Sequence, residues 1–187
     1  MTAVGYGSKL LALSVLFTLG ARGLLAQSQV ISLAALAPGN LSVSLQSGAV
    51  QTIVGVTDNA INNFPSPIVI RTDWNLNPGQ TNTVEVVAYF SIPAQAMTGG
   101  AIQIPSSRIQ GRVTTGLPAA FTPITGNAIG GVGTAGGSLQ LFSVIIGGAN
   151  KNSFRTDNLD LRLDLVGFPT LPAGAYTGVL NIRAVTQ

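Results

Sequence analysis

The residue types that carry most enzyme chemistry are scarce in this chain. Histidine and cysteine are absent from all 187 residues, which excludes Ser-His-Asp and Cys-His catalysis and the usual zinc and haem ligands. A Ser-Lys dyad beyond the N-terminal region would have to use Lys151, which lies in a Gly/Asn stretch without a Ser-x-x-Lys motif. We therefore expect no catalytic, cofactor-binding or metal-binding residues, no cofactor and no enzyme activity.

Three aspartates, Asp157, Asp160 and Asp164, form the only acidic cluster. Neighbouring carboxylates can serve glycoside hydrolysis or bind calcium. However, Asp160 and Asp164 fall on one face of a predicted strand with Arg162 between them, a pattern typical of a charged face with cross-strand partners. We predict a structural role, with calcium binding as the alternative. The Gly131-Val-Gly-Thr-Ala-Gly136 run has the spacing of a dinucleotide fingerprint but lacks a preceding strand and a following helix, so we predict a flexible loop.

The first 26 residues have the features of a signal peptide. Met1 to Lys9 carries one positive charge, and Leu10 to Ala21 is an apolar run too short to span a bilayer as a helix. Cleavage is expected after Ala26, and Ala21-Arg-Gly23 offers a second small-x-small site. The mature chain is then exported, passes through the periplasm, reaches the extracellular space or the cell surface, and does not span a membrane.

The charge and composition of the mature chain bear on its partners and its fold class. Without Lys9 and Arg22, seven basic and six acidic residues remain, and the basic residues are scattered, which argues against nucleic acid as a partner. The chain is rich in Gly, Pro, Val, Ile, Thr, Ser and Asn and poor in Glu and Lys. This composition predicts an all-β protein, and the length of residues 41–187 suits one domain.

Period-two alternation predicts about seven to nine strands, as in an immunoglobulin-like Greek-key β-sandwich. The expected strands are Leu41 to Leu45, Gln51 to Val56, Pro67 to Leu76, Thr83 to Ser91, Ala101 to Ile104, Arg108 to Val113, Leu139 to Ile146, Leu159 to Leu165 and Tyr176 to Val185. The Asn77-Pro-Gly-Gln80 turn predicts that the strands on either side of it form a hairpin. Leu117 to Ser138 and Gly147 to Asn158 are expected to be loops.

The closing run, residues 171–187, reads as a Pro/Gly turn, a Gly-x-Tyr step and one long strand. Leu-x-x-Gly-x-Tyr is typical of a tyrosine corner, so Gly174 and Tyr176 are expected at the corner, and Trp74 in the core. A tyrosine corner usually precedes a further strand, and this chain has none after it. The sandwich is therefore predicted to lack its final strand, unless residues 27–40 supply it as an ordinary first strand.

The signal peptide, the size of the mature domain and the closing Leu171-Pro-Ala-Gly-x-Tyr-x-Gly-x-Leu-x-Ile run resemble pilin-type subunits of bacterial chaperone–usher systems, of the spore coat protein U-like kind. The resemblance implies an incomplete sandwich that receives a donor strand first from a periplasmic chaperone, which acts with an outer-membrane usher, and then from another subunit. It implies a donor arm in residues 27–40, with Val30, Ile31, Leu33 and Leu36 as donor residues. It also implies an acceptor-groove edge formed by Leu141, Val144, Ile146, Tyr176, Leu180 and Ile182.

Two functions follow from these patterns. The first is a structural subunit of an extracellular filament or surface assembly, built by strand exchange and forming stable multimers that require residues 27–40. The second is a stand-alone secreted β-sandwich that binds a glycan or surface ligand through the Thr125 to Gly137 loop. A self-complete sandwich and a saturable ligand titration would favour the second.

Overall fold

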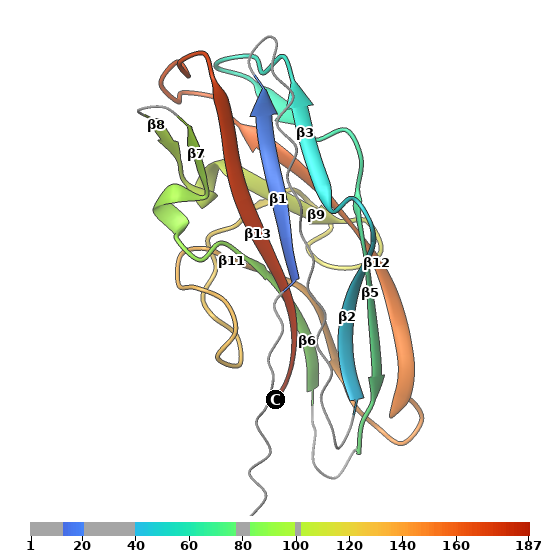
Figure 1. Cartoon of the computed structure of the whole chain (residues 1–187). Coiled ribbons are helices and arrows are strands. Elements are labelled where there is room, and N and C mark those ends of the chain that lie inside the picture. Colours follow the sequence, from blue (N-terminus) through green and yellow to red (C-terminus); the bar gives the residue numbers. More distant parts are fainter. Residues whose placement is uncertain (1–12, 21–39, 78–82, 100–101) are drawn as a thin grey trace, which may run out of the picture.

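The computed structural model describes residues 13–20, 40–77, 83–99 and 102–187, and for residues 13–20 the backbone alone. The described chain is an all-β protein, as predicted, and its strands form two sheets that pack face to face as a β-sandwich (Figure 1). Two short 3₁₀ turns, Pro93–Gln95 and Ser106–Arg108, are the helical elements in this part of the chain.

The first sheet contains the C-terminal strand β13 near its middle. Its strand order is β11 (Ser138–Ile145), β6 (Thr83–Tyr89), β13 (Ala175–Thr186), β1 (Leu13–Gly20) and β3 (Val50–Val54). In addition, β7 (Met97–Gly99) pairs with β13, and β8 (Ile102–Ile104) pairs with β7. All pairings are antiparallel except that of β1 with β3, which is parallel.

The second sheet is antiparallel throughout and is built around the long strand β12. Its order is β10 (Thr122–Pro123), β9 (Ile109–Val113), β12 (Asn152–Asp164), β5 (Ile68–Asn75) and β2 (Asn40–Ser47), with β4 (Ile61–Asn63) also paired to β12.

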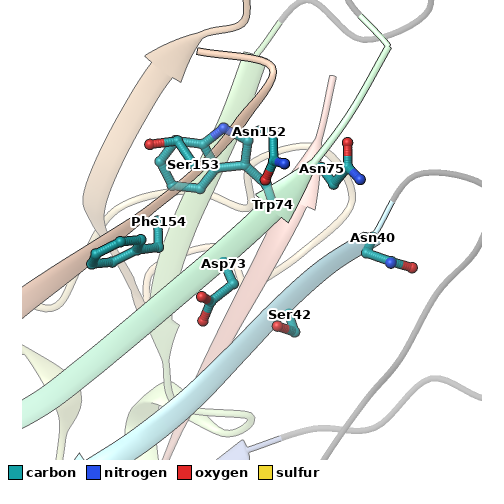
Figure 2. Close-up of a pocket in the computed structure, with 8 residues that line it drawn as sticks. All are labelled: Asn40, Ser42, Asp73, Trp74, Asn75, Asn152, Ser153 and Phe154. Atoms are coloured by element: carbon teal, nitrogen blue, oxygen red, sulfur yellow. The ribbon is translucent and has the colours of Figure 1, made fainter.

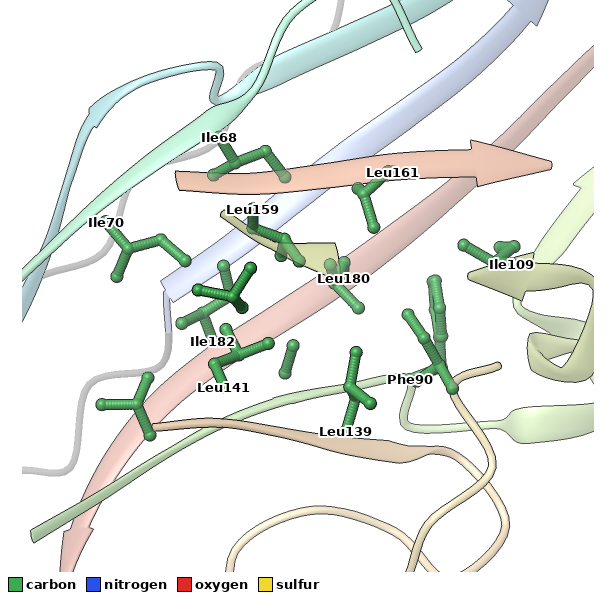
Figure 3. Close-up of a cluster of buried hydrophobic side chains, with 14 of the residues drawn as sticks. Ile68, Ile70, Phe90, Ile109, Leu139, Leu141, Leu159, Leu161, Leu180 and Ile182 are labelled. Carbon is green, nitrogen blue, oxygen red and sulfur yellow. The ribbon is translucent and has the colours of Figure 1, made fainter. Parts of the chain in front are cut away.

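The core lies between the sheets and is made by the alternate residues that each strand turns inward. Figure 3 shows its centre, where side chains of β5, β9 and β12 face side chains of β11, β13 and the end of β6. The fully or almost fully buried members are Ile68, Ile70, Phe90, Ile109, Leu141, Leu159, Leu161, Leu180 and Ile182. The Leu-Asp-Leu-Arg-Leu-Asp-Leu alternation therefore predicted the inward face of β12 correctly.

The expected hairpin around Asn77-Pro-Gly-Gln80 is wrong. β5 pairs with β12 and β2 in the second sheet, whereas β6 pairs with β11 and β13 in the first. The connection between them therefore crosses from one sheet to the other. Alternation predicted both strands but carries no information about which strand each one pairs with.

The predicted loop at Gly147 to Asn158 is too long. β12 already begins at Asn152. The alternation pattern missed its first residues because Arg155 and Asp157 occupy inward positions, where the pattern would require apolar residues. Residues 117–137 contain only the two-residue strand β10 and residues of two isolated bridges, as expected for a long connection, and Ser138 begins β11. Among the described residues, no helix has the length and apolar character needed to cross a membrane.

Candidate functional site: the strand position between β13 and β3

The tyrosine corner at the start of β13 is present. The ring of Tyr176 is buried, and its hydroxyl donates a hydrogen bond to the carbonyl oxygen of Pro172 at 3.2 Å. Burial of the phenol, and secondarily the negative charge of Asp58, raise the pKa of Tyr176. Gly174 lies in this turn but is exposed, and a Cβ there would touch nothing within 4 Å, so it is not a core residue.

Trp74 is a core residue, as the sequence predicted. Its side chain is buried, its indole nitrogen donates to the carbonyl oxygen of Asn150 at 2.8 Å, and its ring lies 6.0 Å from that of Phe142. These contacts join β5 to the turn that precedes β12 and to β11. The position fits a packing role for the indole.

β1 occupies the strand position on the open side of β13. It runs antiparallel to β13, with Leu13 opposite Ile182 and Gly20 opposite Ala175, and parallel to β3, with Leu16 opposite Val50 and Gly20 opposite Val54. The other side of β13 is taken by β6 over residues 181–186 and by β7 at Thr177. Figure 1 shows β1 lying between β13 and β3. In the described part of the chain, β1 is the segment that joins these two strands.

The residues of β13 beside this position belong to the core. With β1 in place, Tyr176, Leu180 and Ile182 are almost completely buried, and on β3 so are Gln51 and Ile53. Because residues directly opposite in a sheet lie on the same face, positions 13, 15 and 19 of β1 stand on the core side beside Ile182, Leu180 and Tyr176. This strand position is therefore part of the wall that closes the sandwich.

Outward positions around β1 are unusually apolar for an exposed surface. Val50 and Val54 of β3 are 48% and 82% exposed, and Val179 of β13 is 41% exposed. They flank β1 in register, since Leu16 lies opposite both Val50 and Val179. Exposed apolar side chains therefore lie on both sides of β1 on the outer face of the sheet.

The expectation that Leu139 to Ile146 borders the same opening as Tyr176 to Val185 is corrected by the strand order. β11 lies at the far edge of the first sheet, with β6 between it and β13. Leu141 and Ile146 are buried and Val144 is partly buried, so they serve the core near another edge. The strand across from β13 is β3, which the sequence predicted as a strand at Gln51 to Val56. Alternation did not show that it lies at this position in the sheet.

The predicted donor residues Val30, Ile31, Leu33 and Leu36 lie outside the described residues. Residue 40, the last of the predicted arm, is the first residue of β2 in the second sheet.

Each member of the aspartate cluster has its own partner. Asp157 is buried and accepts hydrogen bonds from Arg155 Nε at 2.7 Å and Thr115 Oγ1 at 2.8 Å. Asp160 pairs with Arg112 across the strands at 2.6 Å, and Asp164 accepts from Gln110 Nε2 at 3.0 Å. Within the described residues, no three acidic side chains gather in a way that could hold a metal ion. These contacts are the cross-strand pairs that the alternating charges predicted for Asp160, while Asp157 turns inward.

The fold defines the class of protein, which is an all-β sandwich. On one side, the described neighbour of its C-terminal strand β13 is the strand formed by residues 13–20. The chain matches no family model, and comparisons with curated proteins and with solved structures gave no significant match. The resemblance to chaperone–usher pilins therefore stays a prediction.

Proposed function

We propose that the mature chain is a structural subunit of an extracellular filament or surface assembly, in which copies join by adding a β-strand between β13 and β3. One observation carries the proposal. The strand in this position, β1, lies within the predicted signal peptide. Once the signal peptide is removed, no described strand of the mature chain joins β13 to β3.

An empty strand position here would be costly in two ways. The backbone groups of Ala175 to Ile182 on that side of β13, and those of β3, would lose their hydrogen-bond partners. Tyr176, Leu180 and Ile182 would also become more exposed, and full exposure of such a side chain costs about 1.5–3 kcal/mol. An added strand from another chain removes both costs, which is the physical basis of recognition by β-strand addition.

The occupant that we propose is the N-terminal arm, residues 27–39, of a second copy or of a related subunit. This segment precedes β2 and would be the N-terminus of the mature chain after cleavage at Ala26. We propose that it enters as β1 does, antiparallel to β13. By resemblance, a periplasmic chaperone holds the position during export and an outer-membrane usher guides the exchange. The protein is then exported and located at the cell surface, with no catalytic role.

Disulfide trapping tests this geometry directly, because the chain has no cysteine of its own. One variant carries Val179→Cys on the outward face of β13, and a series of others carries one cysteine at each position from Val30 to Leu36. Two full-length variants, each with its own leader, are co-expressed and the exported protein is recovered. A strand paired to β13 should give inter-copy disulfides at alternate arm positions, since only every second side chain lies on the outward face.

The matched control is Ile145→Cys, at an exposed outward position of β11, the other edge of the same sheet. It should give no alternating pattern. Disulfides that alternate with Ile145→Cys and not with Val179→Cys would contradict the proposed position. Equal and weak cross-linking at all positions would contradict strand addition altogether.

A further inference from the structure

The outer face of the second sheet carries an ordered set of polar side chains at one end. Two adjacent rows cross strands β2, β5 and β12. In the first row Asn40 and Asn152 both lie opposite Asn75, and in the second Ser42 and Phe154 both lie opposite Asp73. Residues that are directly opposite share a face, so these six side chains stand on the same surface.

The three asparagines have uncommitted amides. All three are exposed, and none makes a side-chain hydrogen bond to the described part of the chain. Each amide offers two donors and one acceptor oxygen. They line a hollow of about 400 Å³ together with the second row, and Figure 2 shows their side chains around it.

Phe154, the exposed aromatic side chain of the hollow, has a fixed partner on one side. Phe154 is 58% exposed, an unusual value for this side chain. The guanidinium carbon of Arg71 lies 4.1 Å from the centre of its ring, and Arg71 is itself fixed by three hydrogen bonds of 2.7–3.0 Å to Asp73. This arrangement orients the phenyl ring and fixes the Asp73 carboxylate, which also lines the hollow.

We propose that this hollow binds a short neutral oligosaccharide. A sugar ring presents C–H groups on one face, which pack on an aromatic ring, and hydroxyls that donate and accept at once, as amides and carboxylates require. The Arg71–Asp73 ion pair leaves the hollow without net charge, which suits a neutral ligand, and the surrounding Asn and Ser side chains do not suit an apolar one. The three strands span about 10 Å, which is the length of a disaccharide. The site lies on the opposite sheet from β13, so it does not depend on strand addition.

The test uses isothermal titration calorimetry of the exported full-length protein with maltohexaose, cellohexaose and chitohexaose as probes. The fluorescence of Trp74, the only tryptophan and a lining residue of the hollow, serves as a second readout. At least one probe should bind saturably. Phe154→Ala and Asn75→Ala should each weaken that binding about 5- to 10-fold, the loss expected for one stacking contact or one hydrogen bond.

Two controls on the same sheet face match these variants. Phe121→Ala removes a ring that also lies against arginine, with Arg162 4.3 Å from its centre, but that is outside the hollow. Asn158→Ala removes an amide on the same face of β12, further along the strand. Both should bind as the unmodified protein does. Should Phe154→Ala fail to fold by circular dichroism, Asn40→Ala and Asn152→Ala, both at exposed positions, replace it. The proposal is overturned if none of the three probes binds saturably, or if binding survives the substitutions in the hollow.

Discussion

At the scale of single residues, burial gives different roles to carboxylates that look alike in the sequence. Asp157 occupies an inward position of β12 and is almost completely buried, with Arg155 and Thr115 as its partners. Asp160, three residues later, points outward to Arg112, and the side chains of both residues remain partly exposed. Alternation places residues an odd number apart on opposite faces of a strand. The two ion pairs should therefore differ in their contribution to stability.

We expect Asp157→Asn to lower the free energy of unfolding by about 1.5–3 kcal/mol, because a hydrogen bond to a charged group is lost and Arg155 keeps no counter-charge. Asp160→Asn, the matched control, should cost less than about 1 kcal/mol, as exposed pairs do. Urea unfolding of both variants measures the difference. Equal losses for the two variants would contradict the burial-based assignment.

Tyr176 makes stability depend on pH in the alkaline range. Its pKa is raised in the folded protein, so the unfolded chain ionises first as pH rises. The contribution of the neutral phenol is fully present below the ordinary tyrosine pKa of about 10 and is lost as pH rises through the folded pKa. We expect Tyr176→Phe to cost about 0.5–1.5 kcal/mol at neutral pH, through loss of the hydrogen bond to Pro172.

Thermal unfolding measured from neutral pH to about pH 11 checks this dependence. The decline of stability above about pH 10 should be smaller in Tyr176→Phe than in the unmodified protein. Tyr89→Phe retains Tyr176 and serves as the control, so it should keep the full decline. If stability declines above this pH in Tyr176→Phe as it does in the unmodified protein, groups other than Tyr176 cause the decline.

At the scale of elements, β13 depends on a close approach by the segment that leads into β7. Gly178 lies between the buried residues Tyr176 and Leu180 in the inward row of the strand. A Cβ at this position would overlap the carbonyl oxygen of Ala96 and would lie 3.0 Å from Met97 Cγ. Glycine is therefore required here for space, and the contact holds β7 against β13.

Gly178→Ala should destabilise the protein by about 1–3 kcal/mol, the usual cost of overpacking. Gly174→Ala is the matched control four residues away, where a Cβ would meet nothing within 4 Å. It should be neutral or stabilising by up to about 1 kcal/mol, because alanine restricts the unfolded chain. Differential scanning calorimetry of the two variants gives the comparison, and a neutral Gly178→Ala would show that β7 can move away freely.

At the scale of the whole molecule, the open side of β13 decides whether the mature sandwich is complete on its own. Under the proposed strand addition, deletion of residues 27–39 should leave the exported protein monomeric and leave the amides of Ala175 to Ile182 without partners. Hydrogen exchange with mass spectrometry should then show rapid exchange for this segment in the deletion variant and protection in the unmodified protein.

The centre of β12, residues 159–163, is the internal control and should be protected in both proteins. It pairs with β9 along its whole length on one side, and on the other with β5 at Leu159 and with β4 from Arg162 onward. Equal protection of Ala175 to Ile182 in both proteins would mean that the mature chain closes this edge by itself. That result would favour the self-complete binding module.

The sequence by itself determined most of the longer strands, the inward face of β12, the core position of Trp74 and the corner at Tyr176, because alternation and turn residues report local conformation and burial. It did not predict β1 or the short strands β4, β7 and β10. It missed the first residues of β12, where Arg155 and Asp157 turn inward and hide the apolar pattern. Only the tertiary structure decided the partners: β5 and β6 belong to different sheets, and β3 rather than β11 lies across from β13. Strand pairing is non-local, and a strand's own residues specify which face is buried but not which neighbour completes the ladder.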